Sequence, residues 1–233
     1  MKITLTLLCL ISLNLFAKEI SKPCISNFST YSREAFKFIS MPNTNGFDNL
    51  ISDDEFTDIA YTLDDVLEFF EFFPANRFNW DEKCYIYLMS KKNKINVLVL
   101  LVKIQTESSL ISDGLTNDYT RFYRMTWILG CDMYTSMISN GRYIKPYGGF
   151  YKQIERATWR LRGWYDEYYK GKKIVYINFD MKLRPANGAT YALYKYTPFW
   201  GKTIENGAKC TGNENFVSLY QTYKKLWAKV KGT

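Results

Sequence analysis

The stretch INVLVLLVKIQTESS, residues 95–109, decides the fold that the sequence predicts. Every position from Val97 to Val102 is apolar, which indicates a segment buried on most of its sides. Its β-branched residues permit a strand, but its length favours a helix. The stretch therefore predicts a buried central helix that ends at Glu107-Ser108-Ser109.

Glu107 lies at the C-terminal end of this predicted helix. Burial disfavours the charged form of a carboxyl group, and the negative end of the helix dipole disfavours it further. Both effects would hold the Glu107 carboxyl protonated near neutral pH, as a general acid requires. The alternative that the spacing leaves open is the start of an exposed loop, with the side chain in water.

Composition restricts the chemistry available to the chain. Its 233 residues predict one domain, alone or with an extension, and 47% hydrophobic with 23% charged residues is typical of a globular protein. The chain contains no histidine, which excludes Ser-His-Asp and Cys-His nucleophilic sites, HExxH zinc proteases and histidine-dependent deaminase sites. Proton transfer must then use a carboxylate, a tyrosine, a lysine or a cysteine. We expect neither a metal nor a cofactor.

The first 17 residues, MKITLTLLCLISLNLFA, form a predicted signal peptide. Lys2 is their only charged residue, and their apolar stretch is too short for a membrane span. A lipoprotein alternative would need Cys9 as the acylated residue, which is too early to follow a full apolar region. We therefore expect an exported protein, periplasmic or secreted, with no transmembrane segment in its mature chain.

Cysteines and charge give weaker indications about the mature chain. Four cysteines remain after cleavage, so up to two disulfides are possible; Cys24–Cys84 with Cys131–Cys210 would each close one half of the chain. The formal charge of +8 falls to +7 without Lys2, which suits an anionic polymer. No basic stripe or recognition motif indicates a nucleic acid, so we expect no nucleic-acid partner.

Helix signals recur along the rest of the chain. Ser52 followed by Glu55 is typical of a capping box, and acids in a first turn indicate another helix over about 62–70. Further helices are predicted over about 151–169, from Pro185 through Tyr196, and over about 213–231. A short helix near 31–39 and a short strand within 173–180 complete the expectation. The predicted fold class is mainly α (α+β).

Four segments, in this order, resemble the lysozyme-like superfamily, specifically lytic transglycosylases and a divergent secreted branch related to them. LLVKIQTESS, residues 100–109, is similar to a helix ending in Gln-x-Glu-Ser-Ser. GCD, residues 130–132, and GFYKQI, residues 149–154, resemble a Gly-Cys turn and a Gly-Phe-x-x-Gln helix. NGATYALYKYTP, residues 187–198, resembles an Asn-x-Ala-Thr-x-Ala-Leu-Tyr-x-Tyr-Thr-Pro helix. GNENF, residues 212–216, resembles the closing Gly-Asn-x-x-Phe helix.

The resemblance covers about residues 92–228 and departs from the family at two points. The usual Gly-Leu-Met-Gln and Ala-Tyr-Asn-Ala-Gly segments are absent, and residues 192–198 replace the second by register. The resemblance implies a lysozyme-like catalytic domain over 91–233. With the signal peptide over 1–17, this leaves a partly helical N-terminal extension over 18–90, which has no counterpart in the family. In the catalytic domain the buried central helix would end at the catalytic glutamate.

The function that the resemblance implies is cleavage of peptidoglycan at the β-1,4 bond between MurNAc and GlcNAc. In lytic transglycosylases one glutamate, here Glu107, acts first as acid and then as base, while the muramic 6-hydroxyl attacks and a 1,6-anhydro product forms. A muramidase that hydrolyses the same bond would add a second carboxylate, for which Asp113, Asp118 and Asp132 are the reserves. A non-catalytic glycan-binding or envelope-interaction protein on the same fold is the other alternative.

The implied partner is a peptidoglycan glycan strand, and we expect five residues to bind it: Ser109, Gln153, Asn187, Tyr191 and Tyr194. The two tyrosines, three positions apart, could equally pack a helix against the core. Tryptophans at 159, 164 and 200 could stack on sugar rings, although packing is the more common use of this residue. Arginines at 156, 160 and 162 could meet peptide-stem carboxylates. The oligomeric state is left open.

Overall fold

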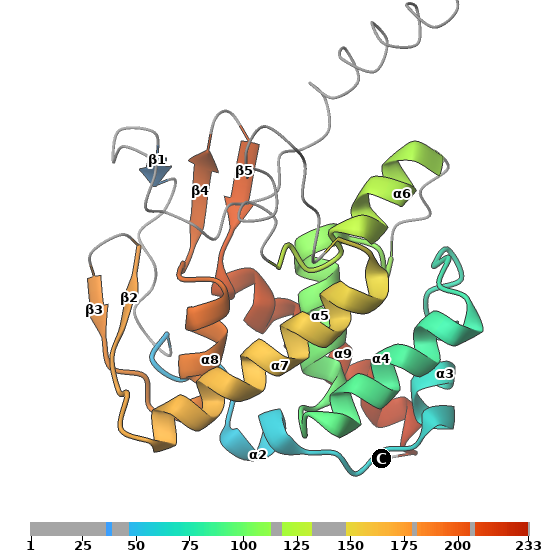
Figure 1. Cartoon of the computed structure of the whole chain (residues 1–233), viewed down its shortest axis with the longest axis horizontal. Helices are drawn as coiled ribbons and strands as arrows, with labels where there is room; N and C mark the ends of the chain where they lie inside the picture. Colours follow the sequence, from blue (N-terminus) through green and yellow to red (C-terminus); the bar gives the residue numbers. More distant parts are fainter. Residues whose placement is uncertain are drawn as a thin grey trace, which may run out of the picture.

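The computed structural model (Figure 1) describes residues 36–38, 47–112, 118–131, 148–178, 181–205 and 208–232. Its fold is mainly helical, as predicted. The helices are α2 (Asp53–Thr57), α3 (Leu63–Glu71), α4 (Trp80–Lys92), α5 (Val97–Ser108), α6 (Asp118–Thr126), α7 (Phe150–Tyr169), α8 (Gly188–Tyr196) and α9 (Asn213–Val230). The strands are β1 (Phe36–Phe38), β2 (Val175–Ile177), β3 (Met181–Leu183), β4 (Lys202–Glu205) and β5 (Ala208–Thr211).

Helix α5 is the buried centre of the molecule, which confirms the prediction from the apolar stretch. Each residue from Val97 to Ile104 is at most 2% exposed. The Asn96 side chain caps the first turn by accepting a hydrogen bond from the Leu98 amide at 2.9 Å. The helix ends where Ser109 adopts a left-handed conformation with φ of 60°.

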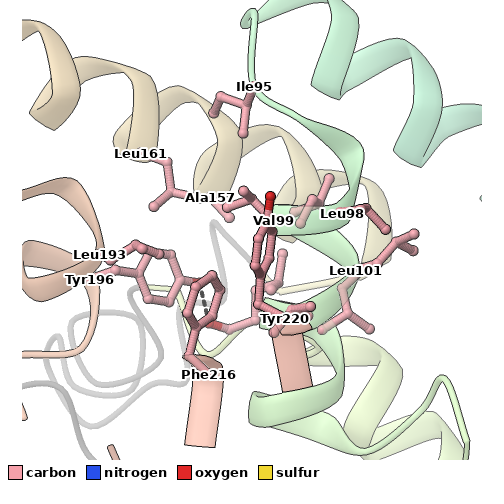
Figure 2. Close-up of a cluster of buried hydrophobic side chains, with 14 of the residues drawn as sticks. Ile95, Leu98, Val99, Leu101, Ala157, Leu161, Leu193, Tyr196, Phe216 and Tyr220 are labelled. Carbon is pink, nitrogen blue, oxygen red and sulfur yellow. Dashed lines mark hydrogen bonds between the residues drawn. The ribbon is translucent and has the colours of Figure 1, made fainter. Parts of the chain in front are cut away.

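Helix α5 packs most closely on α9 and α4, and side chains of α7 and α8 belong to the same buried cluster. In Figure 2, Val99 and Leu101 of α5 lie among side chains of α7, α8 and α9. Contacts come from Ala157 and Leu161 of α7, Leu193 and Tyr196 of α8, and Phe216 and Tyr220 of α9, all of them buried. A segment enclosed in this way must be apolar on nearly every face, which is the pattern that its sequence carries.

Residues 47–92 belong to the same core. Phe56 of α2 is fully buried and stacks on Tyr165 of α7, with ring centroids 5.2 Å apart. Phe69 of α3 lies against Tyr223 and Trp227 of α9, at 5.3 and 5.5 Å. The boundary expected between residues 90 and 91 therefore divides two segments whose side chains pack together.

Local capping signals are confirmed in the structure. Ser52 Oγ accepts from the Glu55 amide at 3.1 Å, and the Glu55 carboxylate accepts from the Ser52 amide at 3.0 Å. These reciprocal bonds form the predicted capping box of α2. Helices α3, α7, α8 and α9 likewise lie within a few residues of their predicted ranges.

The short helix expected near residues 31–39 is wrong where the structure describes it, because Phe36–Phe38 is strand β1. This strand pairs with β4, and β4 pairs with β5, in antiparallel register. A three-residue strand depends on a partner that is distant in sequence, which local periodicity does not reveal. Helix α4 was not predicted either, since its buried residues, Glu82, Ile86 and Ser90, do not make an apolar stripe.

The predicted disulfides are not formed by the two cysteines whose side chains the structure describes. Cys84 lies partly exposed on α4 and Cys131 lies buried, and neither belongs to a disulfide. Cys24 is outside the described residues, and the side chain of Cys210 is outside them too. Within the described ranges, no helix is both long enough and apolar enough to cross a bilayer.

The central position of α5 predicts unequal effects of the same substitution at two leucines. Leu100→Ala removes a fully buried side chain from α5 and is expected to lower the free energy of unfolding by about 2–5 kcal/mol. Leu88→Ala removes a side chain that is 53% exposed on α4 and should change it by less than about 1 kcal/mol. Urea denaturation followed by tryptophan fluorescence measures both; equal losses would contradict the buried centre.

Candidate functional site

The Glu107 carboxylate forms an ion pair with a lysine one turn earlier on α5. Lys103 Nζ lies 2.8 Å from Glu107 Oε1. The side chain of Lys103 is 2% exposed, whereas that of Glu107 is 20% exposed. The ammonium is thus enclosed by protein, while the carboxylate reaches the boundary between the interior and solvent.

Residues at the end of α8 complete the surroundings of the ammonium. Lys103 Nζ donates to Thr197 Oγ1 at 2.7 Å and lies 4.4 Å from the ring centroid of Tyr196. Thr197 Oγ1 in turn lies 3.4 Å from Glu107 Oε1 and donates to it. We call these four residues, Lys103, Glu107, Tyr196 and Thr197, the Glu107 cluster.

This environment differs from the one expected for Glu107. The position at the end of a buried helix is as predicted, and Glu107 is part of α5 rather than of an exposed loop. However, the carboxylate forms an ion pair with the Lys103 ammonium at 2.8 Å, a contact that was not expected from the sequence. From the described residues, Glu107 Oε2 receives no hydrogen bond, so this oxygen is the one that a ligand could engage.

Tyr196 connects the cluster to the turn that contains Cys131. Its hydroxyl donates to the Leu129 carbonyl and lies 3.1 Å from Cys131 Sγ. Burial, together with the nearby Cys131 and Glu107, raises the pKa of Tyr196 well above its ordinary value. The phenol therefore stays protonated and holds α8 against residues 129–131.

Gln153, expected to bind substrate, holds the same turn in place. Its Oε1 accepts from the Cys131 amide at 2.9 Å, and its Nε2 donates to the Cys131 carbonyl at 2.8 Å. The side chain is fully buried on α7. One side-chain amide thus pairs with both the amide and the carbonyl of Cys131, which explains a glutamine at this position.

The start of α9 fixes the segment that follows Thr197. Asn213 Nδ2 donates to the Thr197 carbonyl at 2.7 Å and to the Phe199 carbonyl at 3.3 Å. A Cβ at Gly212 would lie 2.4 Å from the Phe199 carbonyl oxygen, so only glycine permits this approach. The Gly-Asn pair thus holds the segment from Thr197 to Phe199 against the start of α9.

The remaining predicted binding residues lie elsewhere. Ser109 is the C-cap of α5, two residues beyond Glu107, and is partly buried. Asn187 is the N-cap of α8, at the end opposite to Thr197; it accepts from the Thr190 amide at 2.8 Å and donates to the Ile51 carbonyl at 2.9 Å. Both positions have structural roles, and only Ser109 is close to Glu107 in the chain.

Tyr191 and Tyr194 pack in the core, as the alternative interpretation of their spacing allowed. They are 2% and 0% exposed, and the Tyr194 hydroxyl donates to the Phe47 carbonyl at 2.7 Å. Burial raises the pKa of both phenols, helped by Glu167 at Tyr191 and by Asp48 at Tyr194. Since all of α8 except Lys195 is buried, its tyrosines are directed into protein.

The aromatic and basic candidates of α7 are spread along the helix. Trp159 is 57% exposed under the guanidinium of Arg156, which lies 4.8 Å from its ring centroid. Trp164 is partly buried and meets the Tyr196 ring edge-on at 6.1 Å, while Arg160 lies 5.7 Å from its ring. Arg162 pairs with Asp166 at 2.9 Å. Trp164 therefore contacts the Glu107 cluster through Tyr196.

Trp200 and the reserve carboxylates contribute little to the described site. Trp200 is 8% exposed and packs in the core. Asp113 and Asp132 lie outside the described residues, as does the side chain of Asp118 at the start of α6. Among the described residues, no group of three or more cysteine, aspartate or glutamate side chains could hold a metal ion.

Lys103 and Thr197 were not among the expected site residues. A lysine within an apolar helix, four residues before a glutamate, is a local signal of an ion pair on one helix face. No comparable signal identifies Thr197, because 94 residues separate it from Lys103.

Comparisons with known proteins give no match to the chain, whether with protein-family models, curated proteins or solved structures.

The enclosed ammonium predicts strong coupling between Lys103 and Glu107. Glu107→Gln leaves an almost fully buried positive charge without its counter-ion, whereas Lys103→Met leaves a carboxylate that can turn towards water. We expect the first substitution to be the more destabilising, and the double variant to be less destabilised than the sum by about 0.5–3 kcal/mol.

The surface pair Lys224–Glu55 is the matched control for this cycle. Its atoms are 2.6 Å apart, but the lysine is 52% exposed, so its coupling energy should stay below about 1 kcal/mol. Both cycles are measured by chemical denaturation. Additive effects at Lys103 and Glu107 would show that the two charges do not stabilise each other.

Proposed function

We propose that the protein is an exported enzyme that cleaves peptidoglycan glycan strands, with a lysozyme-like catalytic domain from residue 91. The proposed bond is the β-1,4 linkage between MurNAc and GlcNAc, and Glu107 is the proposed proton donor and acceptor. Export rests on the predicted signal peptide, and the reaction rests on the family resemblance together with the contacts at the Glu107 cluster.

One observation carries the proposal: the four segments that resemble the lysozyme-like family are joined by hydrogen bonds. Glu107 and Lys103 of the first segment contact Thr197 of the third. Asn213 of the fourth segment bonds to the Thr197 carbonyl. In the second segment, Gln153 bonds to Cys131, whose Sγ contacts Tyr196. Segments that share only a sequence pattern have no reason to meet around one carboxylate, so this convergence supports the resemblance.

In the proposed reaction, Oε2 of a protonated Glu107 gives its proton to the glycosidic oxygen as the C1–O bond breaks. Positive charge develops at C1, and the leaving GlcNAc departs as an alcohol. The carboxylate that remains is stabilised by Lys103 and Thr197 at Oε1. It then accepts the proton of the MurNAc 6-hydroxyl as O6 bonds to C1, which gives the 1,6-anhydro product and restores protonated Glu107.

The Lys103 ion pair favours a second candidate, a non-catalytic glycan-binding or envelope-interaction protein. The Glu107 carboxylate already has a partner inside the protein, the Lys103 ammonium at 2.8 Å, so its position can be explained without a bound substrate. In that case the cluster would only stabilise the junction of α5 and α8. A muramidase is the remaining variant of the enzymatic proposal and would release reducing ends.

Digestion of purified peptidoglycan sacculi separates these functions. We expect wild-type protein to release 1,6-anhydro muropeptides, identified by mass spectrometry, and Glu107→Gln to release them about 10²–10⁴-fold more slowly, because proton transfer by a positioned side chain contributes about that much. Glu68→Gln, an exposed glutamate of α3, is the matched control and should retain full activity.

Two further variants separate a catalytic defect from a loss of folding. Glu107→Asp keeps the charge but retracts it from Lys103, so it should lose activity with little change in the far-ultraviolet circular dichroism spectrum. Lys103→Met removes the hydrogen bond to Glu107 Oε1 that would stabilise the carboxylate between the two steps, and should therefore lower the rate of product release. If wild-type protein leaves the sacculi intact but sediments with them, the result would establish a glycan-binding protein instead of an enzyme.

A further inference from the structure

The β2–β3 hairpin has one face in the core and one face in solvent. It stands at the edge of the molecule beyond the C-terminal end of α7 (Figure 1). On the inner face, Val175, Ile177 and Leu183 are at most 7% exposed, and β2 packs against α8. Because side chains alternate along a strand, the residues between these positions are directed outward.

The outward positions combine apolar and cationic side chains. Ile174 is 43% exposed and Tyr176 is 63% exposed. Lys182 pairs directly with Tyr176 across the ladder, and Arg184 follows two residues later on the same side; both are exposed. We call Ile174, Tyr176, Lys182 and Arg184 the hairpin face.

The turn that leads from α7 into the hairpin adds further positive charge. It contains Lys170, Lys172 and Lys173, while Asp180 is the single acid in the sequence from 170 to 184. Lys172 pairs with Glu167 at 3.2 Å, and Lys173 Nζ lies 3.3 Å from the ring centroid of Tyr168. Lys170, Lys182 and Arg184 form no ion pair with other described residues, so their charges are available to a partner.

We propose that the hairpin face docks on an anionic lipid bilayer surface. Cationic side chains beside a negatively charged leaflet are attracted to its headgroups. Tyrosine is suited to the headgroup level, with its ring towards the acyl chains and its hydroxyl towards water. An exposed isoleucine between these groups gains free energy when it leaves water for the acyl boundary. The charge of the face therefore selects the lipid, and its apolar residues hold it at the interface.

The apolar residues favour a bilayer over an anionic wall polymer. Ile174, which is 43% exposed, offers neither a planar ring nor a hydrogen-bonding group to a sugar, and Met181, 42% exposed at the start of β3, adds apolar surface beside the hairpin face. Their exposure to water is unfavourable, and a polar polymer would not relieve it. A lipid interface does, which makes it the occupant that both the charge and the apolarity of this face fit.

Vesicle sedimentation with the full protein, after any N-terminal processing, tests the proposal. We expect binding to vesicles of phosphatidylglycerol and phosphatidylcholine, and much weaker binding to phosphatidylcholine alone. Lys182→Gln with Arg184→Gln should weaken binding to the anionic vesicles about 10–30-fold, since each cation near such a surface contributes roughly fivefold. Ile174→Ser should weaken it several-fold.

Matched controls come from exposed positions on other helices. Lys225→Gln with Lys229→Gln removes two exposed cations from α9, and Leu88→Ser removes an exposed leucine from α4. Both should bind vesicles like the wild type. Because vesicle binding is measured without sacculi, a failure of the proposed function leaves this test intact. Equal binding of the hairpin and control variants would overturn the proposal. The proposal would also be overturned if the protein bound sacculi but not vesicles, and if the hairpin variants lost this binding to sacculi. That result would assign the face to a wall polymer.

Discussion

A buried positive charge constrains the centre of this protein. Lys103 lies on a helix whose neighbouring residues are apolar and almost fully enclosed, so its ammonium has exchanged water for three protein partners. Loss of hydration is costly for an ammonium, and it is offset only when carboxylate, hydroxyl and aromatic groups are placed with good geometry. The end of α8, the start of α9 and the turn at Cys131 all help to hold these partners in position.

This constraint relates the two candidate functions to each other. The same contacts that would stabilise the Glu107 carboxylate between the two steps of a transglycosylation also stabilise it in a protein that performs no chemistry. The two functions differ in one step: only the enzyme would transfer a proton between Glu107 Oε2 and a bound glycan.

Much of the fold could be predicted because its signals are local. The apolar run of α5, the Ser52–Glu55 capping box and the periodicity of α7 and α9 each lie within one segment. Strand β1 depends on a partner more than 160 residues away, and α4 buries a glutamate and a serine rather than an apolar stripe. At the site, the position of Glu107 followed from its helix, whereas the roles of Thr197, Tyr191 and Tyr194 followed from how α8 passes through the core.

The long sequence separation between members of the Glu107 cluster determines when the cluster forms during folding. Lys103 and Thr197 meet only after a loop of more than 90 residues has closed, and Asn213 must arrive as well. Contacts of such range form together with the global fold rather than ahead of it. A chain that is still extended therefore carries Glu107 as a solvated side chain, and the arrangement around it forms only when folding is completed.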